Sequence, residues 1–164
     1  MAEAVVSIRT AGYGSSPLLP LALLATSLDQ NTLEAFIDRL NAPLTWAAVI
    51  RDTYTLKKRL LSISTAETPR PSTLYAKVFD LAPEVILGWG VVAPDQETRK
   101  LLINFHTKWR YVKPLLTGDD LLALNVPQGP QVGELLKELL YARLDGFVLT
   151  REAEERFVRS HLSP

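Results

Sequence analysis

The chain has 164 residues, of which 47% are apolar and 22% charged, and it contains no cysteine. This size and composition are typical of one soluble globular domain or of a compact region with a small appendage, and the lack of cysteine excludes disulfides and thiolate chemistry. The 18 basic and 18 acidic residues cancel, which excludes strong nucleic-acid binding through overall charge, so any such binding must depend on local patches. With no apolar run of membrane-spanning length and no secretory signal, we expect a cytoplasmic protein.

The predicted secondary structure is helical almost throughout. Residues 1–15 show no sustained apolar period and are predicted to be an irregular N-terminal segment. Beyond them, apolar residues recur three and four positions apart, while proline, glycine and asparagine separate the segments. The predicted helices cover, in chain order, residues 16–28, 31–40, 45–61, 72–81, 83–92, 97–113, 117–125, 130–145 and 150–162. No segment alternates with period two, so we predict an all-α fold, a compact array of helices with essentially no β-sheet.

Local signals predict where several of these helices begin and end. Asn31 and Glu34 form a plausible capping box, and Thr117 with Asp120 caps a later helix. Asn41 suits the left-handed conformation that ends a helix. These signals act within single turns, so they predict the limits of helices but not how the helices pack.

A boundary between two regions is predicted near residue 113. Pro114 ends the preceding helix, and the helices after it are shorter. We therefore predict a helical body over residues 16–112 and a C-terminal helical tail over residues 113–164, which contains the turn formed by Gly129 and Pro130.

Basic side chains gather on one face of the predicted 97–113 helix. At 100° per residue, four of them fall within about 60° of one another: Arg99, His106, Arg110 and Lys113. No acidic residue occurs from Arg99 to Lys113. Such a face could track an RNA backbone by charge. A solvated face whose basic end complements the helix dipole explains the same pattern, and the residues alone favour that interpretation.

The turn around Gly129 and Pro130 is a second candidate RNA-binding site. An apolar helix, a glycine-containing turn and a second helix follow the logic of helix-hairpin-helix modules, which offer backbone amides to phosphates. Gly129 and Gly133 leave the backbone uncovered. Pro130 has no amide, so the predicted donors are Gln131, Val132 and Gly133. The alternative is an ordinary helix–helix connection in which glycine and proline only shape the turn, and without further information we favour it.

No pattern for catalysis or metal binding is recognisable. The sequence has no Asp-x-Asp pair for two-metal nucleotidyl transfer, no P-loop, no dinucleotide-binding glycine fingerprint and no nucleophile–base pair in a known context. His106 and His161 are far apart in the sequence, and neither lies beside an aspartate. We therefore predict no catalytic residue, no metal site and no cofactor within this chain.

The segment from Lys113 to Leu162 resembles the bacterial tRNA nucleotidyltransferase and poly(A) polymerase family. The likeness depends on the spacing of Leu116-Thr117-Gly118, Gly129-Pro130, Gly133 and Leu144-Asp145-Gly146. Upstream the likeness is looser, and Asn125 stands where family members commonly have glycine. Members of this family place catalysis in an N-terminal head with a carboxylate pair, followed by a helical body and tail that hold RNA.

The resemblance implies a non-catalytic tRNA- or RNA-binding helical region, which positions the RNA 3′ end for a catalytic head domain absent from this chain. The implied partners are tRNA or another structured RNA and that head, with no membrane, and Mg²⁺ and ATP or CTP would belong to the head. We expect a fragment of a longer nucleotidyltransferase, while CCA addition, A addition and poly(A) synthesis stay open. The alternative is a helical protein-interaction or scaffold domain with no nucleic-acid role, which the neutral net charge favours.

Overall fold

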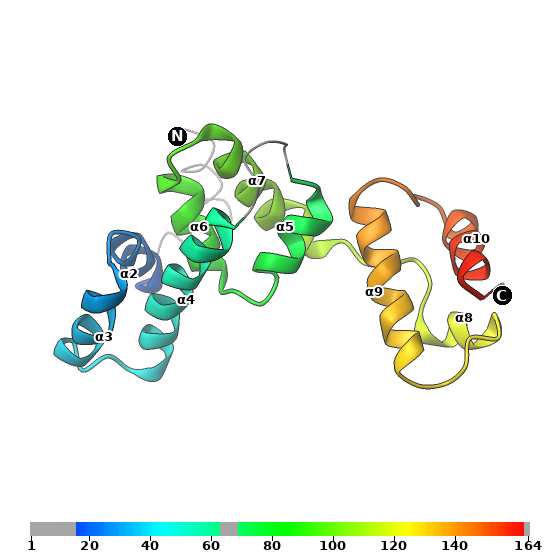
Figure 1. The fold of residues 1–164 in the computed structure, drawn as a ribbon, viewed down its shortest axis with the longest axis horizontal. Helices are drawn as coiled ribbons and strands as arrows, with labels where there is room; N and C mark the ends of the chain where they lie inside the picture. The colour runs from blue at the N-terminus through cyan, green and yellow to red at the C-terminus, as the bar shows by residue number, and fades with distance from the viewer. Residues whose placement is uncertain (1–15, 63–68, 163–164) are drawn as a thin grey trace. The chain divides into compact units, whose positions relative to one another are not determined.

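The computed structural model describes residues 16–62 and 69–162, and the predicted irregular segment 1–15 lies outside these ranges. The described residues form nine α-helices and one 3-10 helix, Trp109–Tyr111, with no strand among them, which confirms the predicted all-α fold (Figure 1). In chain order the α-helices are α2 (Leu18–Ala25), α3 (Gln30–Arg39), α4 (Leu44–Leu61), α5 (Pro71–Val78), α6 (Pro83–Val92), α7 (Gln96–Thr107), α8 (Gly118–Ala123), α9 (Pro130–Leu144) and α10 (Arg151–Leu162).

The chain divides into two compact units. Unit 1 comprises Met1–Pro69 and Thr73–Arg110, and unit 2 comprises Arg70–Ser72 and Tyr111–Pro164. Each unit has an apolar cluster of its own. The units are therefore described separately.

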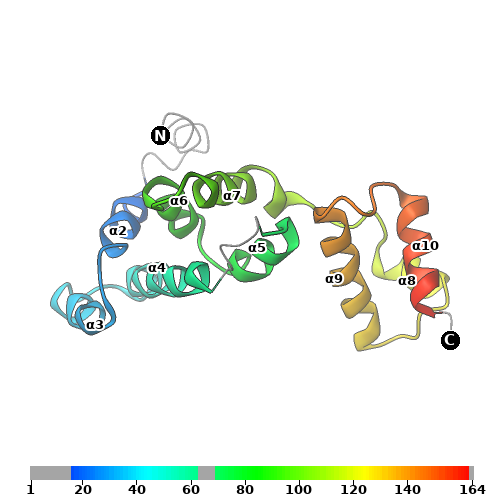
Figure 2. The same cartoon turned by 45° about the horizontal axis from the view of Figure 1, so that its top comes forward.

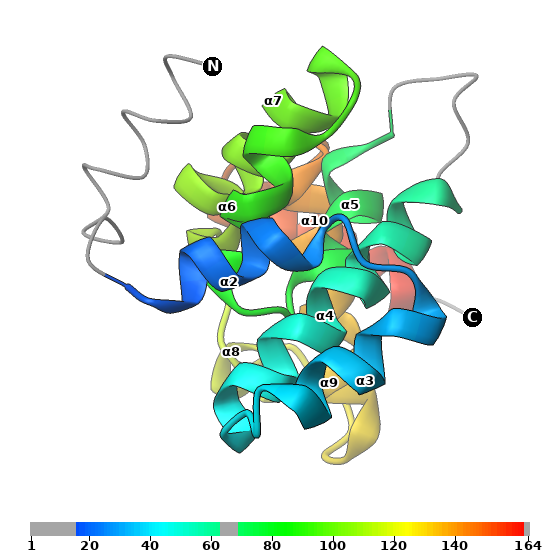
Figure 3. The same ribbon diagram turned by 90° about the vertical axis from the view of Figure 1, so that its left-hand side faces the viewer.

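The core of unit 1 is built around α6. This helix is apolar on all sides, as expected of a central helix, and its residues 85–90 are all buried. It packs against α2, α4 and α7 (Figures 2 and 3). A methyl group added at Gly88 would lie 3.4 Å from the Ala22 side chain, which shows that α2 lies directly against α6 at this point. The Trp89 indole donates to the Thr53 carbonyl over 2.9 Å, which fixes α6 against α4.

The start of α3 differs from the prediction. Asp29, not Asn31, is the N-cap, and its carboxylate accepts hydrogen bonds from the amides of Asn31 and Thr32 over 2.9 and 2.8 Å. Thr32 completes the capping box, because its hydroxyl accepts from the Asp29 amide. Glu34 is thereby left to pair with Arg51 on α4 at 2.6 Å. Asp29 has the extended backbone of an N-cap residue, whereas Asn31 already lies inside the helix.

The end of α7 also differs from the prediction. The helix stops at Thr107 and does not continue to Lys113, because Lys108 has φ −130° and ψ −62°, outside helical geometry. The Thr107 hydroxyl donates to the Ile103 carbonyl over 2.8 Å, a contact common where helices bend or end. Residues 109–111 then form the short 3-10 helix. The predicted face shared by four basic residues along one helix is therefore wrong.

Unit 2 consists of three helices around a small apolar cluster. α8, α9 and α10 each contribute to it, together with the chain on either side of α8: Leu116, Leu121, Val126, Leu135, Leu139 and Val158. The predicted cap of α8 is confirmed, since Asp120 accepts from the Thr117 amide over 2.7 Å and Thr117 accepts from the Asp120 amide over 3.4 Å. Asn125 takes the left-handed conformation, with φ 67°, and so ends this helix where a glycine would otherwise be favoured.

Candidate RNA-binding surface

The exposed surfaces of unit 2 are held in place by one buried carboxylate. Glu154 on α10 is fully buried, and it accepts hydrogen bonds from the amides of Leu115 and Leu116, over 2.8 and 2.9 Å. Arg143 on α9 donates to the same carboxylate over 3.2 Å. A buried charge is stable only when paired and hydrogen-bonded, as it is here. Glu154 thus joins α9, α10 and the chain before α8.

Sequence reasoning missed Glu154. One signal was present, because Glu154 stands four residues before Val158, on the apolar face of an otherwise polar helix. An acidic residue on such a face indicates a buried partner, although the sequence does not say which one.

The start of α9 is open to solvent. Gly129 has φ 143°, a conformation that residues other than glycine rarely adopt. Pro130 occupies the first helical position. Gln131 and Gly133 are exposed, and a methyl group added at Gly133 would meet no atom of the described residues within 4 Å. Close packing between helices therefore does not explain why position 133 is a glycine.

One predicted phosphate donor is already in use. The Val132 amide donates to the Gly129 carbonyl over 3.2 Å, closing the turn at the start of α9. The predicted donor Val132 therefore already has a partner within the turn. The positive end of the helix dipole lies at this turn, and the helix places the exposed residues Gln131 and Gly133 there.

An open groove of about 810 Å³ adjoins the start of α9. It brings Gln131 together with two basic residues near the end of α10, which sequence reasoning did not select. Polar and apolar residues line it in equal number: Ala123, Leu124, Asn125, Pro127, Gln131, Arg159, His161 and Leu162. The signal for these basic residues was their place in the last turn of the final helix. The groove can present positive charge beside an exposed helix N-terminus.

Arg159 and His161 both lie near carboxylates of unit 2. Arg159 lies 3.7 Å from Glu155, and the His161 Nε2 lies 3.5 Å from Glu138. The opposite ring nitrogen of His161 is 2.8 Å from the Phe157 carbonyl. Both pairs are exposed, and exposed pairs contribute little energy, so a phosphate can compete with Glu155 for the Arg159 charge.

The four basic residues predicted on one helix face do not share one helix in the structure. His106 is only 3% exposed, and its Nδ1 lies 3.3 Å from the Arg110 guanidinium. The Arg99 guanidinium donates to the Pro94 carbonyl over 3.2 Å. Lys113 is exposed but belongs to unit 2. Because His106 is buried, it is not available for surface contact with RNA.

Comparison with known proteins gives one match. Over 90 residues, the chain is 37% identical to the A-adding tRNA nucleotidyltransferase of Geobacter sulfurreducens. The chain is similar to one region of a tRNA nucleotidyltransferase. This finding confirms the resemblance drawn from the sequence. The match covers 55% of this chain and 10% of the relative, so the chain spans about a tenth of that protein's length. The sequence matches no protein-family model, and no solved structure matches it.

The residues that carry the resemblance to tRNA nucleotidyltransferases lie at helix ends in unit 2. Thr117 and Asp120 cap α8, and hydrogen bonds from Thr117 and then Arg151 lower the pKa of Asp120 to about 2. Asp145, at the end of α9, accepts from the Ser72 amide and hydroxyl over 2.9 and 2.7 Å. Gly146 follows with φ 81°. The motif residues thus cap helices and connect segments, so their spacing along the sequence follows the lengths of α8 and α9.

Two further properties of the described residues bear on function. No helix among residues 16–62 and 69–162 is long and apolar enough to span a bilayer. Within the same ranges, no three histidine, aspartate or glutamate side chains are arranged to hold a metal ion.

The buried His106 predicts a pH dependence of stability. Burial lowers its pKa, the Arg110 charge lowers it further, and Glu84 acts in the opposite direction. The unfolded chain therefore binds a proton more readily, so His106 supports folding above pH about 6.5 and this support is lost as the pH falls through its folded pKa. We expect the free energy of unfolding, measured by urea titration, to decrease from pH 7.5 to 5.5. The His106→Gln variant should show a smaller decrease, and an equal decrease would contradict this role.

Proposed function

We propose that this chain is the non-catalytic, RNA-holding helical region of a tRNA nucleotidyltransferase or poly(A) polymerase-type enzyme of the cytoplasm. The observation that carries the proposal is the 37% identity to the A-adding tRNA nucleotidyltransferase. In this proposal, the chain positions the RNA 3′ end for a catalytic head domain outside it. Mg²⁺ and ATP or CTP would act in that head.

Unit 2 supplies the surface that we assign to the RNA backbone. The exposed start of α9 at Gln131 and Gly133 offers the positive end of a helix dipole, and Arg159 and His161 line the adjoining groove. Lys113 adds an exposed charge in the same unit. Helical RNA is recognised mainly by shape and by contacts to phosphates and 2′-hydroxyls, which such a surface suits.

Unit 1 supplies weaker support. Arg99 and Arg110 stay candidates for phosphate contact, although they do not share a continuous helix with Lys113. Both side chains make contacts within unit 1, with Pro94 and His106, respectively. We therefore place the main RNA contact on unit 2.

Binding of a tRNA transcript at 50 to 200 mM salt tests the proposal. Affinity should fall as salt rises, since phosphate contacts release counterions. The triple variant Lys113→Gln, Arg159→Gln, His161→Gln should flatten the logarithmic salt slope by up to about 2.7 units, at about 0.7–0.9 per phosphate contact. The matched control, Arg39→Gln with Lys58→Gln on α3 and α4, should leave the slope unchanged. No binding at 50 mM salt would instead favour the protein-interaction alternative.

A second assay addresses the non-catalytic role. Incubated with tRNA, magnesium and ATP or CTP, the chain should leave the RNA 3′ end unextended, because we assign the carboxylates for two-metal transfer to the head. The products are resolved on a denaturing gel beside a mock preparation from the same host. Extension above the mock level would place catalysis within this chain and contradict the proposal.

A further inference from the structure

The connection between α9 and α10 presents an aromatic ring to solvent. α9 ends in a Schellman motif, in which Gly146 has φ 81° and the Phe147 amide donates to the Ala142 carbonyl over 2.8 Å. The residue at the Phe147 position of this motif usually packs against the last turn of its helix. Here Phe147 is 67% exposed, while the adjacent Val148 is only 5% exposed. Packing against the end of α9 therefore does not explain why position 147 is a phenylalanine.

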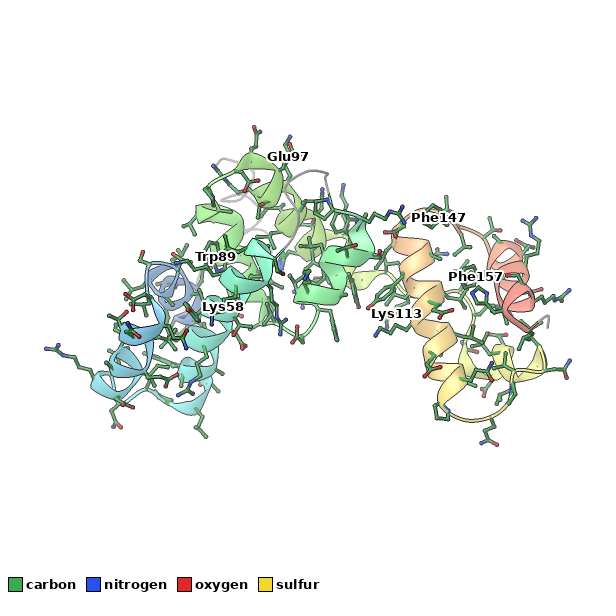
Figure 4. The ribbon with its side chains drawn as sticks, viewed as in Figure 1. Lys58, Trp89, Glu97, Lys113, Phe147 and Phe157 are labelled. Carbon is green, nitrogen blue, oxygen red and sulfur yellow. The ribbon has the colours of Figure 1, made fainter. Side chains whose placement is uncertain are left out.

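A cation accompanies this ring. The Arg70 guanidinium carbon lies 5.7 Å from the centre of the Phe147 ring, within the range of a cation–π contact. The segment that carries Arg70 is fastened nearby, because Ser72 donates two hydrogen bonds to Asp145. Figure 4 labels the Phe147 side chain, which stands on the connection between α9 and α10. The ring and the charge, which are far apart in the sequence, are thus held together in unit 2.

The backbone beside the ring is also fixed. Arg143 donates to the Leu149 carbonyl over 3.3 Å and to the buried Glu154 over 3.2 Å, and Glu154 accepts from the Leu115 amide. Leu149 and Leu115 are nevertheless 64% and 42% exposed. Because this backbone is already held, a ligand that covers these side chains has little backbone left to order.

We propose that Phe147, together with Arg70, is a stacking platform for one unpaired base of the bound RNA. This inference rests on the proposed function and adds that unit 2 favours RNA with an unpaired nucleotide, whichever base that nucleotide carries. An exposed ring and a guanidinium both stack on bases, and the positive charge suits the neighbouring phosphate. Stacking uses the face of a base and not its edges, so the platform should accept any of the four bases.

Two RNA probes test this platform on the full chain, with affinity measured by fluorescence anisotropy. One probe is a blunt duplex, and the other is the same duplex with three unpaired adenosines at one end. We expect the wild-type chain to bind the extended probe about tenfold more tightly, as stacking of one base permits. Phe147→Ala should abolish that preference and leave affinity for the blunt duplex unchanged. Phe147→Trp should keep the preference, because indole also stacks, and circular dichroism should show all three proteins equally folded.

The outcomes separate this inference from the proposed function. If the wild-type chain binds both probes equally, or if Phe147→Ala retains the preference, Phe147 is not a stacking platform, although RNA binding by the chain stands. A protein surface would then be the better partner for Phe147 and Arg70. If neither probe nor tRNA binds, the proposed function fails and the platform fails with it.

Discussion

Replacing Glu154 by alanine is expected to lower the free energy of unfolding of unit 2 by about 3–5 kcal/mol, the cost of breaking a buried ion pair from one side. The substitution would leave the amides of Leu115 and Leu116 and the Arg143 guanidinium without the carboxylate that now accepts from all three. Hydrogen exchange measured on peptides from α8, α9 and α10 reports this loss directly. Exchange in α2, α4 and α6 of unit 1 provides an internal reference.

A neighbouring residue supplies the control for Glu154. Glu155 stands next in α10, but it is partly exposed and lies 3.6 and 3.7 Å from Arg151 and Arg159. Exposed pairs of this kind contribute up to about 1 kcal/mol, so Glu155→Ala should change exchange in unit 2 only slightly. Equal effects of the two variants would show that Glu154 is no more than a surface charge. Glu154→Gln, which keeps one acceptor oxygen, should fall between them.

Replacing Gly133 by glutamate is expected to change stability and RNA affinity in opposite directions. Stability should rise by about 1 kcal/mol, because glycine is a poor helix former and a carboxylate in the first turn complements the helix dipole. No atom of the described residues lies within 4 Å of a methyl group added there, so the new side chain should not clash. Affinity for tRNA should fall about tenfold or more, since a carboxylate about 4 Å from a phosphate costs about 1–4 kcal/mol.

Gly133→Ala separates the charge from the added bulk. It should give most of the stability gain, and it should weaken tRNA binding less than glutamate does, because it obstructs the backbone without repelling the phosphate. Melting temperature and tRNA affinity are measured on the same preparations. If Gly133→Glu is stabilised but binds tRNA as tightly as the wild-type chain, the start of α9 does not contact RNA.

The all-α fold and several helix ends were predictable from the sequence, because the signals for them are local. Apolar periodicity locates a helix from its own residues. Asn41 and Asn125 adopt φ of 44° and 67°, as asparagine next to a helix end can, and Thr117 with Asp120 forms a capping box across three positions. Each of these features closes within about one turn, so no distant residue was needed to predict it.

The candidate sites could not be predicted to the same extent. A helical wheel extended through residue 113 grouped Arg99 with Lys113. However, α7 ends at Thr107, and the non-helical backbone of Lys108 means that the two residues do not share a helix. His106 lay on the predicted basic face and is buried. Capping chemistry predicted Asn31 as the cap of α3, whereas Asp29 takes that position.

The sequence alone determined the helical fold, the turn at Gly129 and the likeness to tRNA nucleotidyltransferases, because these depend on residue order and short-range geometry. Only the tertiary structure showed that Glu154 accepts from amides nearly forty positions away, that Arg159 and His161 line a groove beside Gln131, and that Arg70 lies over Phe147. Such contacts depend on how helices pack after loops close, and packing is the outcome of many weak interactions that no single segment contains.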